Sequence, residues 1–144
     1  MVLLRRQGWV ASFLQGEIMN NGKRILLVED DHVIQKLITK LCARRGVQVT
    51  VADNHNDINQ ALEKATDFSM FFIDLILPEI TGWEVLQKIK SNPALNNKPT
   101  IVLTGAILSQ HEKDKILKQA SAVIEKKSFS LPLFDEILTK ILAE

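Results

Sequence analysis

Cysteine, long apolar stretches and an excess of charge of one sign are all scarce in this sequence of 144 residues. Its single cysteine, Cys42, excludes an internal disulfide and fits a reducing compartment, which predicts a cytoplasmic location. No apolar run reaches the roughly 20 residues of a membrane-spanning helix, so we expect no membrane segment. The formal net charge is only +1, and residues 25–144 carry a slight acidic excess. Nucleic acid is therefore not expected as a partner.

The first 22 residues differ in pattern from the rest. Arg5 and Arg6 follow an apolar start, but the next apolar positions are interrupted too often by polar residues for a signal peptide. We expect either a disordered extension over residues 1–22 or a start codon placed too early, with Met19 as the true start. Residues 23–144 then form one domain. The composition of the whole chain, 46% hydrophobic and 24% charged, is ordinary for a globular domain.

Five short apolar segments alternate with five segments of helical periodicity. The expected strands are 24–28, 47–51, 70–73, 100–104 and 122–125, and the expected helices lie around 33–41, 58–65, 82–89, 109–119 and 131–142. Asp31 is placed to cap the first helix, and Gly46 to end it. The last helix has an apolar stripe made by Leu131, Phe134, Ile137, Leu138 and Ile141. Such alternation predicts an α/β fold, a doubly wound parallel sheet with helices on both faces.

Polar residues with chemical capacity follow four of the five strands. Glu29 and Asp30 follow the first strand, and Asp74 follows the third; Thr104 ends the fourth, and Lys126 follows the fifth. Because parallel strands end at one edge of a sheet, these side chains should meet there. Mg²⁺ would supply the counter-charge that the carboxylates need, and a lysine pairs well with phosphate. The set suits phosphoryl transfer, with the aspartate of the third strand as a nucleophile that forms an acyl phosphate.

These positions and their spacing resemble the receiver domains of bacterial two-component response regulators, the CheY-like superfamily. The matching residues are Glu29, Asp30, Asp74, Pro78, Gly82, Thr104 and Lys126. The resemblance covers about residues 23–142. It implies a flavodoxin-like (βα)5 sheet of strand order 2-1-3-4-5. That order agrees with the strict apolar–polar alternation of residues 47–51, which indicates a strand near the sheet edge.

The resemblance also implies a role for each residue. Asp74 would accept a phosphoryl group from a sensor histidine kinase or a phosphotransfer protein. Thr104 would be the switch hydroxyl, and Lys126 would pair with the phosphoryl group. The implied Mg²⁺ ligands are Glu29, Asp30, Asp74 and the main-chain carbonyl of Ile76. The output would be phosphorylation-dependent binding of a protein partner through helix 109–119, strand 122–125 and helix 131–142, because only two residues follow Leu142.

The sequence departs from the family in three places. The family usually has proline after the lysine, joined by a cis peptide, whereas Lys127 follows Lys126 here, so we expect a trans bond and an altered loop. Spacing favours Lys126 as the site lysine, while alignment on Phe129 favours Lys127, and both remain open. Val123 replaces the family's switch aromatic. Ile76 is large and apolar, and we expect it to hinder water and prolong the life of the acyl phosphate.

Two other functions compete with a phosphorylation switch that has no enzymatic activity beyond its own phosphotransfer and dephosphorylation. One is a pseudo-receiver, an interaction module that is never phosphorylated. The missing proline is the feature that favours it. The other is a Mg²⁺-dependent phosphatase with an aspartate nucleophile, similar to the haloacid dehalogenases. That enzyme needs a second aspartate where Ile76 stands. Cys42 lies between apolar residues on a helix and is interpreted as a small buried hydrophobe.

Overall fold

The computed structural model describes residues 22–142. The expected extension, residues 1–22, lies outside this range except for Gly22. In the described part of the chain no helix is long and apolar enough to cross a membrane.

A five-stranded sheet forms the centre of the molecule, and all its strand pairs are parallel. Its strands are β1 (Arg24–Val28), β2 (Gln48–Ala52), β3 (Met70–Asp74), β4 (Thr100–Thr104) and β5 (Ala122–Glu125). Their order is β2-β1-β3-β4-β5, which confirms the expected topology. The continuous apolar runs form inner strands of the sheet, as their composition predicts. Every residue of β3 and β4 is buried. The alternating segment became the edge strand β2, as expected.

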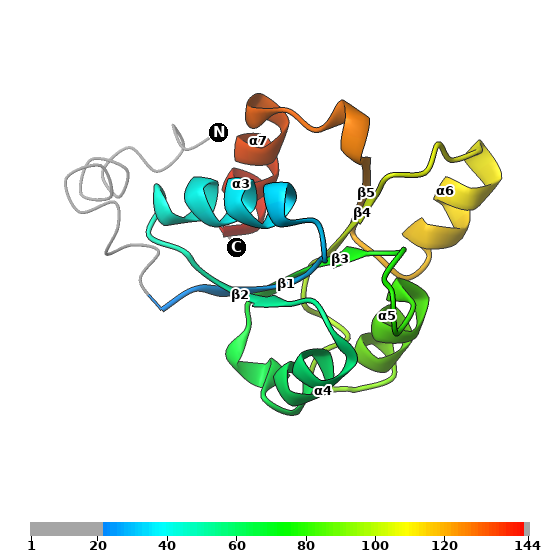
Figure 1. Ribbon diagram of the computed structural model, residues 1–144, viewed down its shortest axis with the longest axis horizontal. Coiled ribbons are helices and arrows are strands. Elements are labelled where there is room, and N and C mark those ends of the chain that lie inside the picture. The colour runs from blue at the N-terminus through cyan, green and yellow to red at the C-terminus, as the bar shows by residue number, and fades with distance from the viewer. Residues whose placement is uncertain (1–21, 143–144) are drawn as a thin grey trace.

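Helices cover both faces of the sheet (Figure 1). On one face lie α3 (His32–Ala43) and α7 (Leu131–Leu142), and on the other lie α4 (His55–Glu63), α5 (Gly82–Lys90) and α6 (Gln110–Leu117). Two short 3₁₀ helices, η2 (Ala65–Asp67) and η3 (Lys126–Ser128), precede β3 and follow β5. The strands alternate with helices along the chain, so each parallel pair is joined by a crossover.

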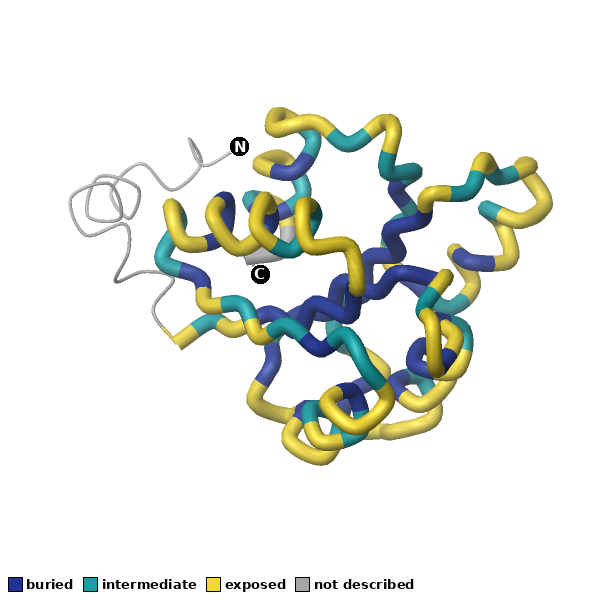
Figure 2. Tube along the Cα trace, viewed as in Figure 1, coloured by how far each residue is buried: buried dark blue, intermediate teal, exposed yellow. Residues whose placement is uncertain are grey.

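Each face of the sheet has its own hydrophobic core. Side chains alternate along a strand, so Leu26 and Val28 belong to one core while Ile25 and Leu27 belong to the other. All four are fully buried. Figure 2 shows the resulting dark band of buried backbone through the middle of the molecule. Cys42 is a residue of α3, belongs to the same core as Ile25 and Leu27, and is fully buried. This confirms its interpretation as a small buried hydrophobe.

Each of the helices α3 to α6 begins at a side-chain cap. Asp31 Oδ1 accepts from the backbone N–H of Val33 at 2.9 Å, as predicted from its position. Ser109 forms a reciprocal capping box with Glu112. Asn54 and Thr81 cap the two helices between them. These caps set the points where the chain turns from the strand ends into the helices.

Several local expectations were wrong. Leu131 was placed in the apolar stripe of α7 but is 43% exposed, because it opens the helix beyond the end of β5. Helix α6 is shorter than the expected 109–119. Gly46 does not directly follow the helix cap, which is Arg44, but takes a φ of 72° two residues later. The side chain of Ile141 lies outside the described part of the structure.

Candidate functional site

The site lies at the edge of the sheet where the parallel strands end. Glu29 follows β1 directly, and Asp74 is the last residue of β3. The strands β1 and β3 are neighbours in the sheet. The exposed fraction is 0% for Glu29 and 2% for Asp74. The structure therefore brings together the two acidic residues that the strand pattern predicts to meet. Burying two carboxylates side by side requires compensation by a positive charge.

Lys126 supplies that charge. Its Nζ lies 2.8 Å from Glu29 Oε1 and 3.1 Å from Asp74 Oδ2. Burial lowers the pKa of Lys126, but the hydrogen bonds and charges of the two carboxylates raise it more, and the net pKa shift is upward. Lys127, the alternative, is exposed. The peptide bond between the two lysines is trans, as expected, since the described residues contain no cis bond.

Glu29 is the most electrostatically perturbed carboxyl of the site. Burial and the neighbouring Asp74 raise its pKa to about 7, against the opposing effects of Lys126 and the Asp31 N–H. Its Oε2 accepts from the backbone N–H groups of Asp30 and Asp31, at 3.0 and 3.2 Å. Its Oε1 is within ion-pair distance of Lys126 but has no hydrogen bond of good geometry in the described chain. This oxygen is a buried acceptor with capacity for a further positive ligand.

Three carboxylates are arranged so that a hard cation could bind. Asp30 is exposed, and one oxygen each of Glu29, Asp30 and Asp74 lie within 4.8 Å of one another. Mg²⁺ prefers such oxygen donors and keeps part of its water shell, which the exposed Asp30 side would allow. Together with the unsatisfied Oε1 of Glu29, this donor set fits the metal. The carbonyl of Ile76 as a further ligand remains a prediction.

The backbone around Asp74 holds its carboxylate in place. The N–H of Ile76 donates to Asp74 Oδ1 at 3.1 Å, while Lys126 contacts Oδ2. A Cβ added to Gly82 would lie 2.1 Å from the Asp74 carbonyl oxygen. The N–H of Gly82 donates to the carbonyl of Leu75 at 3.1 Å. Glycine is therefore required at this position, because α5 begins directly against the backbone of the aspartate.

Thr104 ends β4 and is buried. Its Oγ1 accepts from the N–H of Ala106 at 3.1 Å. In the described structure it makes no hydrogen bond to Asp74 or Lys126. Thr104 thus stands at the end of its strand, and its hydroxyl is engaged with its own loop; its role as a switch residue remains a prediction.

Two side chains near the site make contacts that were not foreseen. Gln35 on α3 donates to the carbonyl of Glu29 at 2.7 Å and to Asp53 Oδ2 at 3.3 Å. Glu125 Oε2 accepts from the N–H of Leu108 at 2.9 Å. Both side chains contact a distant loop, and neither follows a repeating sequence pattern that could have revealed it.

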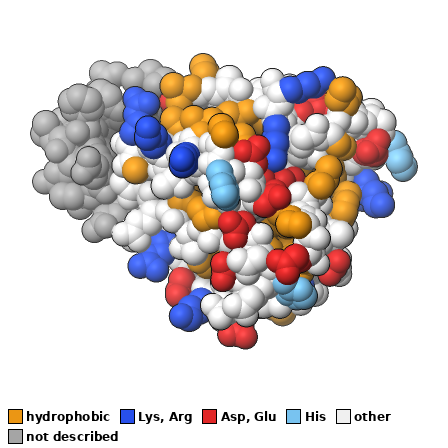
Figure 3. Space-filling view, viewed as in Figure 1, with side chains coloured by type: hydrophobic (Ala, Val, Ile, Leu, Met, Phe, Trp, Pro, Cys, Tyr) orange, Lys and Arg blue, Asp and Glu red, His pale blue; other side chains and the backbone are white. Residues whose placement is uncertain are grey.

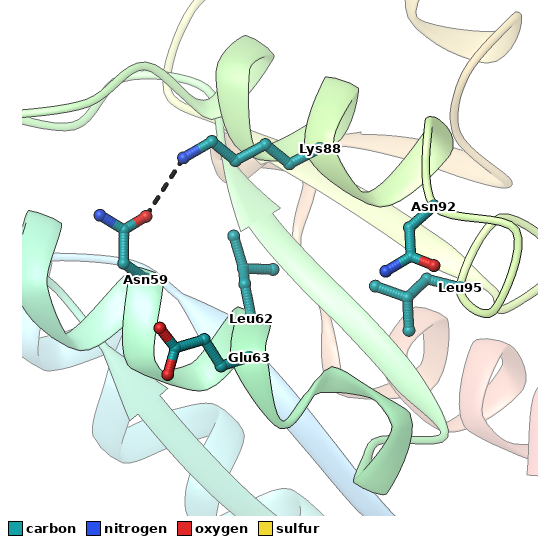
Figure 4. A pocket seen from close by; sticks show the side chains of 6 residues that line it. All are labelled: Asn59, Leu62, Glu63, Lys88, Asn92 and Leu95. Atoms are coloured by element: carbon teal, nitrogen blue, oxygen red, sulfur yellow. Dashed lines mark hydrogen bonds between the residues drawn. The ribbon is translucent and has the colours of Figure 1, made fainter.

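Acidic side chains gather near the middle of the face in Figure 3, with hydrophobic side chains beside them. A separate groove lies between α4 and α5 (Figure 4) and is lined by Asn59, Leu62, Glu63, Lys88, Asn92 and Leu95. Lys88 Nζ donates to Asn59 Oδ1 there at 3.1 Å. None of the predicted site residues lines this groove, so the groove and the acidic site are distinct features.

The parallel sheet, with two buried carboxylates bridged by a lysine at its C-terminal edge, defines the class of phosphoryl-accepting α/β domains. The model of the response regulator receiver domain family matches residues 25–138. The chain belongs to this family, whose members act in two-component signalling and bind Mg²⁺ at an acidic site.

Known relatives agree with this assignment. The chain is 34% identical over 97 residues to the transcriptional regulatory protein GltR of Pseudomonas aeruginosa, covering 67% of this chain and 38% of GltR. It is 31% identical to the two-component response regulator ORR13 of rice, covering 59% of this chain and 70% of that protein. The chain thus spans less than half of GltR.

Solved structures share the fold. The receiver domain of the DNA-binding response regulator MerR from Colwellia psychrerythraea matches with a TM-score of 0.77 at 22% identity, over 85% of this chain and 99% of that one. The receiver domain of sensor histidine kinase PA1611 from Pseudomonas aeruginosa matches with a TM-score of 0.70 at 25% identity, over 85% and 99% of the two chains. That structure holds a magnesium ion coordinated in its active-site cleft.

Proposed function

We propose that this chain acts as a response regulator receiver that accepts a phosphoryl group on Asp74. The donor is a sensor histidine kinase or a phosphotransfer protein, and Mg²⁺ is held by Glu29, Asp30 and Asp74 with the carbonyl of Ile76. One observation carries the proposal: Lys126 Nζ contacts Asp74 and Glu29 together, beside a third carboxylate.

The residues have separate tasks in the transfer. A carboxylate oxygen of Asp74 attacks phosphorus, a new O–P bond forms, and the P–N bond to the donor histidine breaks with the electron pair passing to that nitrogen. Lys126 neutralises negative charge on the phosphoryl oxygens, and the N–H of Ile76 orients the attacking carboxylate. Bound Mg²⁺ would supply further charge neutralisation. The hydroxyl of Thr104 then donates a hydrogen bond to a phosphoryl oxygen.

The lifetime of the acyl phosphate depends on Ile76. Its side chain is 63% exposed, and its N–H contacts the Asp74 carboxylate, so an apolar group stands beside the site where water must arrive. We expect a long-lived phosphoprotein, with faster hydrolysis after Ile76→Asn. Loss of phosphate within seconds from the purified wild-type phosphoprotein would contradict this.

The output is a change in partner binding. The surface made by α6, β5 and α7 would contact a downstream protein once Asp74 is phosphorylated, because the phosphoryl group adds about 1.5 to 2 negative charges that Thr104 and Lys126 can bind. Val123 on β5 is half-buried and aliphatic, so readout through a swinging ring is not expected. We place the chain in the cytoplasm and assign it no turnover of an external substrate.

The test is phosphorylation by a small donor. The full chain is incubated with Mg²⁺ and acetyl phosphate, and its intact mass is measured beside Asp74→Asn and the surface control Asp57→Asn. We expect one added phosphoryl group on the wild type and the control, none on Asp74→Asn, and none when the metal is chelated. No addition to the wild type, or equal addition to Asp74→Asn, would refute the proposal, the first result favouring a pseudo-receiver.

A further inference from the structure

The loop between β4 and α6, residues 105–109, is held at two points. Near its start the N–H of Ala106 donates to Thr104 Oγ1 at 3.1 Å. Near its end the N–H of Leu108 donates to Glu125 Oε2 at 2.9 Å. The first contact lies within one turn of chain, whereas the second joins the loop to a different strand. The loop position therefore depends on Glu125.

Glu125 lies between the two residues that would bind a phosphoryl group. It pairs with Thr104 across the β4–β5 ladder, and it directly precedes Lys126. A Cβ built on Gly105 would be 4.0 Å from Lys126 Cδ, so the start of the loop lies beside the stem of that lysine. One carboxylate thus connects the loop after Thr104 to the end of β5, directly before Lys126.

The contact is charge-assisted. The Leu108 N–H lowers the pKa of Glu125, burial opposes this, and the charges of Lys113 and Lys127 lower the pKa further, so the carboxyl is ionised at neutral pH. A hydrogen bond from an N–H to a carboxylate is stronger than one to a neutral oxygen. The contact therefore resists displacement of the loop.

We propose that Glu125 is a positioning residue, which restrains the 105–109 loop and thereby limits how readily Thr104 turns toward a phosphoryl group on Asp74. In the present arrangement the Thr104 hydroxyl is bonded to Ala106 and not to the acidic site. Moving it onto a phosphoryl oxygen shifts the start of the loop, and this movement strains the Glu125–Leu108 contact. The inference rests on the proposed function.

The experiment compares Glu125→Ala with Glu125→Gln. The alanine variant removes the acceptor for Leu108, while glutamine keeps a side-chain oxygen that can accept the same bond. The matched control is Glu136→Ala on α7, an exposed glutamate whose ion pair with Lys140 lies within its own helix. Amide hydrogen exchange over residues 105–109 reports the restraint, and the affinity for beryllium fluoride with Mg²⁺, a phosphoryl mimic, reports its effect on the site.

In Glu125→Ala we expect roughly tenfold faster exchange of the Leu108 amide, given the usual strength of a hydrogen bond to a charged acceptor. The affinity for beryllium fluoride should rise by up to the same factor, because a larger fraction of molecules can close the loop. Glu125→Gln should lie between the wild type and Glu125→Ala in both measurements, because its neutral oxygen accepts a weaker bond than a carboxylate does, and the control should change neither.

The outcomes separate the two proposals. Faster exchange with unchanged or weaker affinity for the mimic would refute the positioning role, since the contact would then only stabilise the loop. Unchanged exchange would refute the restraint itself. Failure of the wild type to bind beryllium fluoride would instead refute the proposed function, and the exchange data would stand on their own.

Discussion

The raised pKa of Glu29 should make Mg²⁺ binding at the proposed site dependent on pH. Burial first, and Asp74 second, raise this pKa to about 7, whereas the metal binds the ionised carboxylate. The apparent affinity is reduced by the factor 1 + 10^(pKa − pH), which is about eleven at pH 6 and close to one at pH 8. We therefore expect Mg²⁺ to bind about tenfold more tightly at pH 8 than at pH 6.

The same shift affects stability, and its sign can be worked out. The folded-state pKa of Glu29 is raised from 4.5 to about 7, so the native state holds a proton that the unfolded chain has released. This contribution to stability is present in full below pH 4.5 and is lost as the pH rises through about 7. The loss amounts to about 3 kcal/mol at most. Bound Mg²⁺ should recover part of it at pH 8.

Isothermal calorimetry at pH 6 and pH 8 measures the affinity directly, in two buffers of different ionisation enthalpy so that proton release is also counted. Glu29→Gln is the control, because its side chain does not titrate and its weaker binding should vary much less with pH. Equal affinities at the two pH values in the wild type, or tighter binding at pH 6, would show that Glu29 does not titrate in competition with the metal.

Three further predictions concern single side chains. Gly82→Ala should lower the free energy of unfolding by about 1–3 kcal/mol in urea titrations, because the new methyl group collides with the Asp74 carbonyl oxygen; unchanged stability would contradict the close approach. Lys126→Met should slow phosphorylation by acetyl phosphate roughly a hundredfold, while Lys127→Met should leave it nearly unchanged. Equal effects would show that either lysine can serve. Burial raises the pKa of Cys42 to about 12, so native protein should resist a thiol reagent at pH 8 and react once unfolded. Rapid labelling of the native protein would count against its burial.

The inner strands and the position of the acidic site could be predicted from sequence. Strands β1, β3 and β4 are short apolar runs, and a parallel sheet collects their C-terminal residues at one edge, so Glu29 and Asp74 had to come close. The strands and their shared edge follow from periodicity and chain direction, whereas the order that makes β1 and β3 neighbours was implied by the family resemblance. Periodicity and chain direction are properties of the local sequence.

Contacts that depend on loop geometry could not be predicted in the same way. The choice between Lys126 and Lys127 depends on the 3₁₀ turn after β5, which decides the side chain that points back to the carboxylates. The Glu125–Leu108 bond depends on the path of an irregular loop. Leu131 shows a related limit, since its spacing fits the apolar stripe of α7 while its place at the helix start leaves it exposed.

The central position of β1 has a consequence for how the chain folds during synthesis. This strand leaves the ribosome before the others and pairs on one side with β2 and on the other with β3, so Ile25 can pair with Val49 early but has no partner on its β3 side until Met70 has been made. Its apolar run must remain unpaired on that side through the intervening synthesis, and such non-local pairing is slow. The strand that carries Asp74 is the one that completes the middle of the sheet. Substitutions in residues 70–74 are therefore expected to reduce the yield of folded protein as well as its signalling.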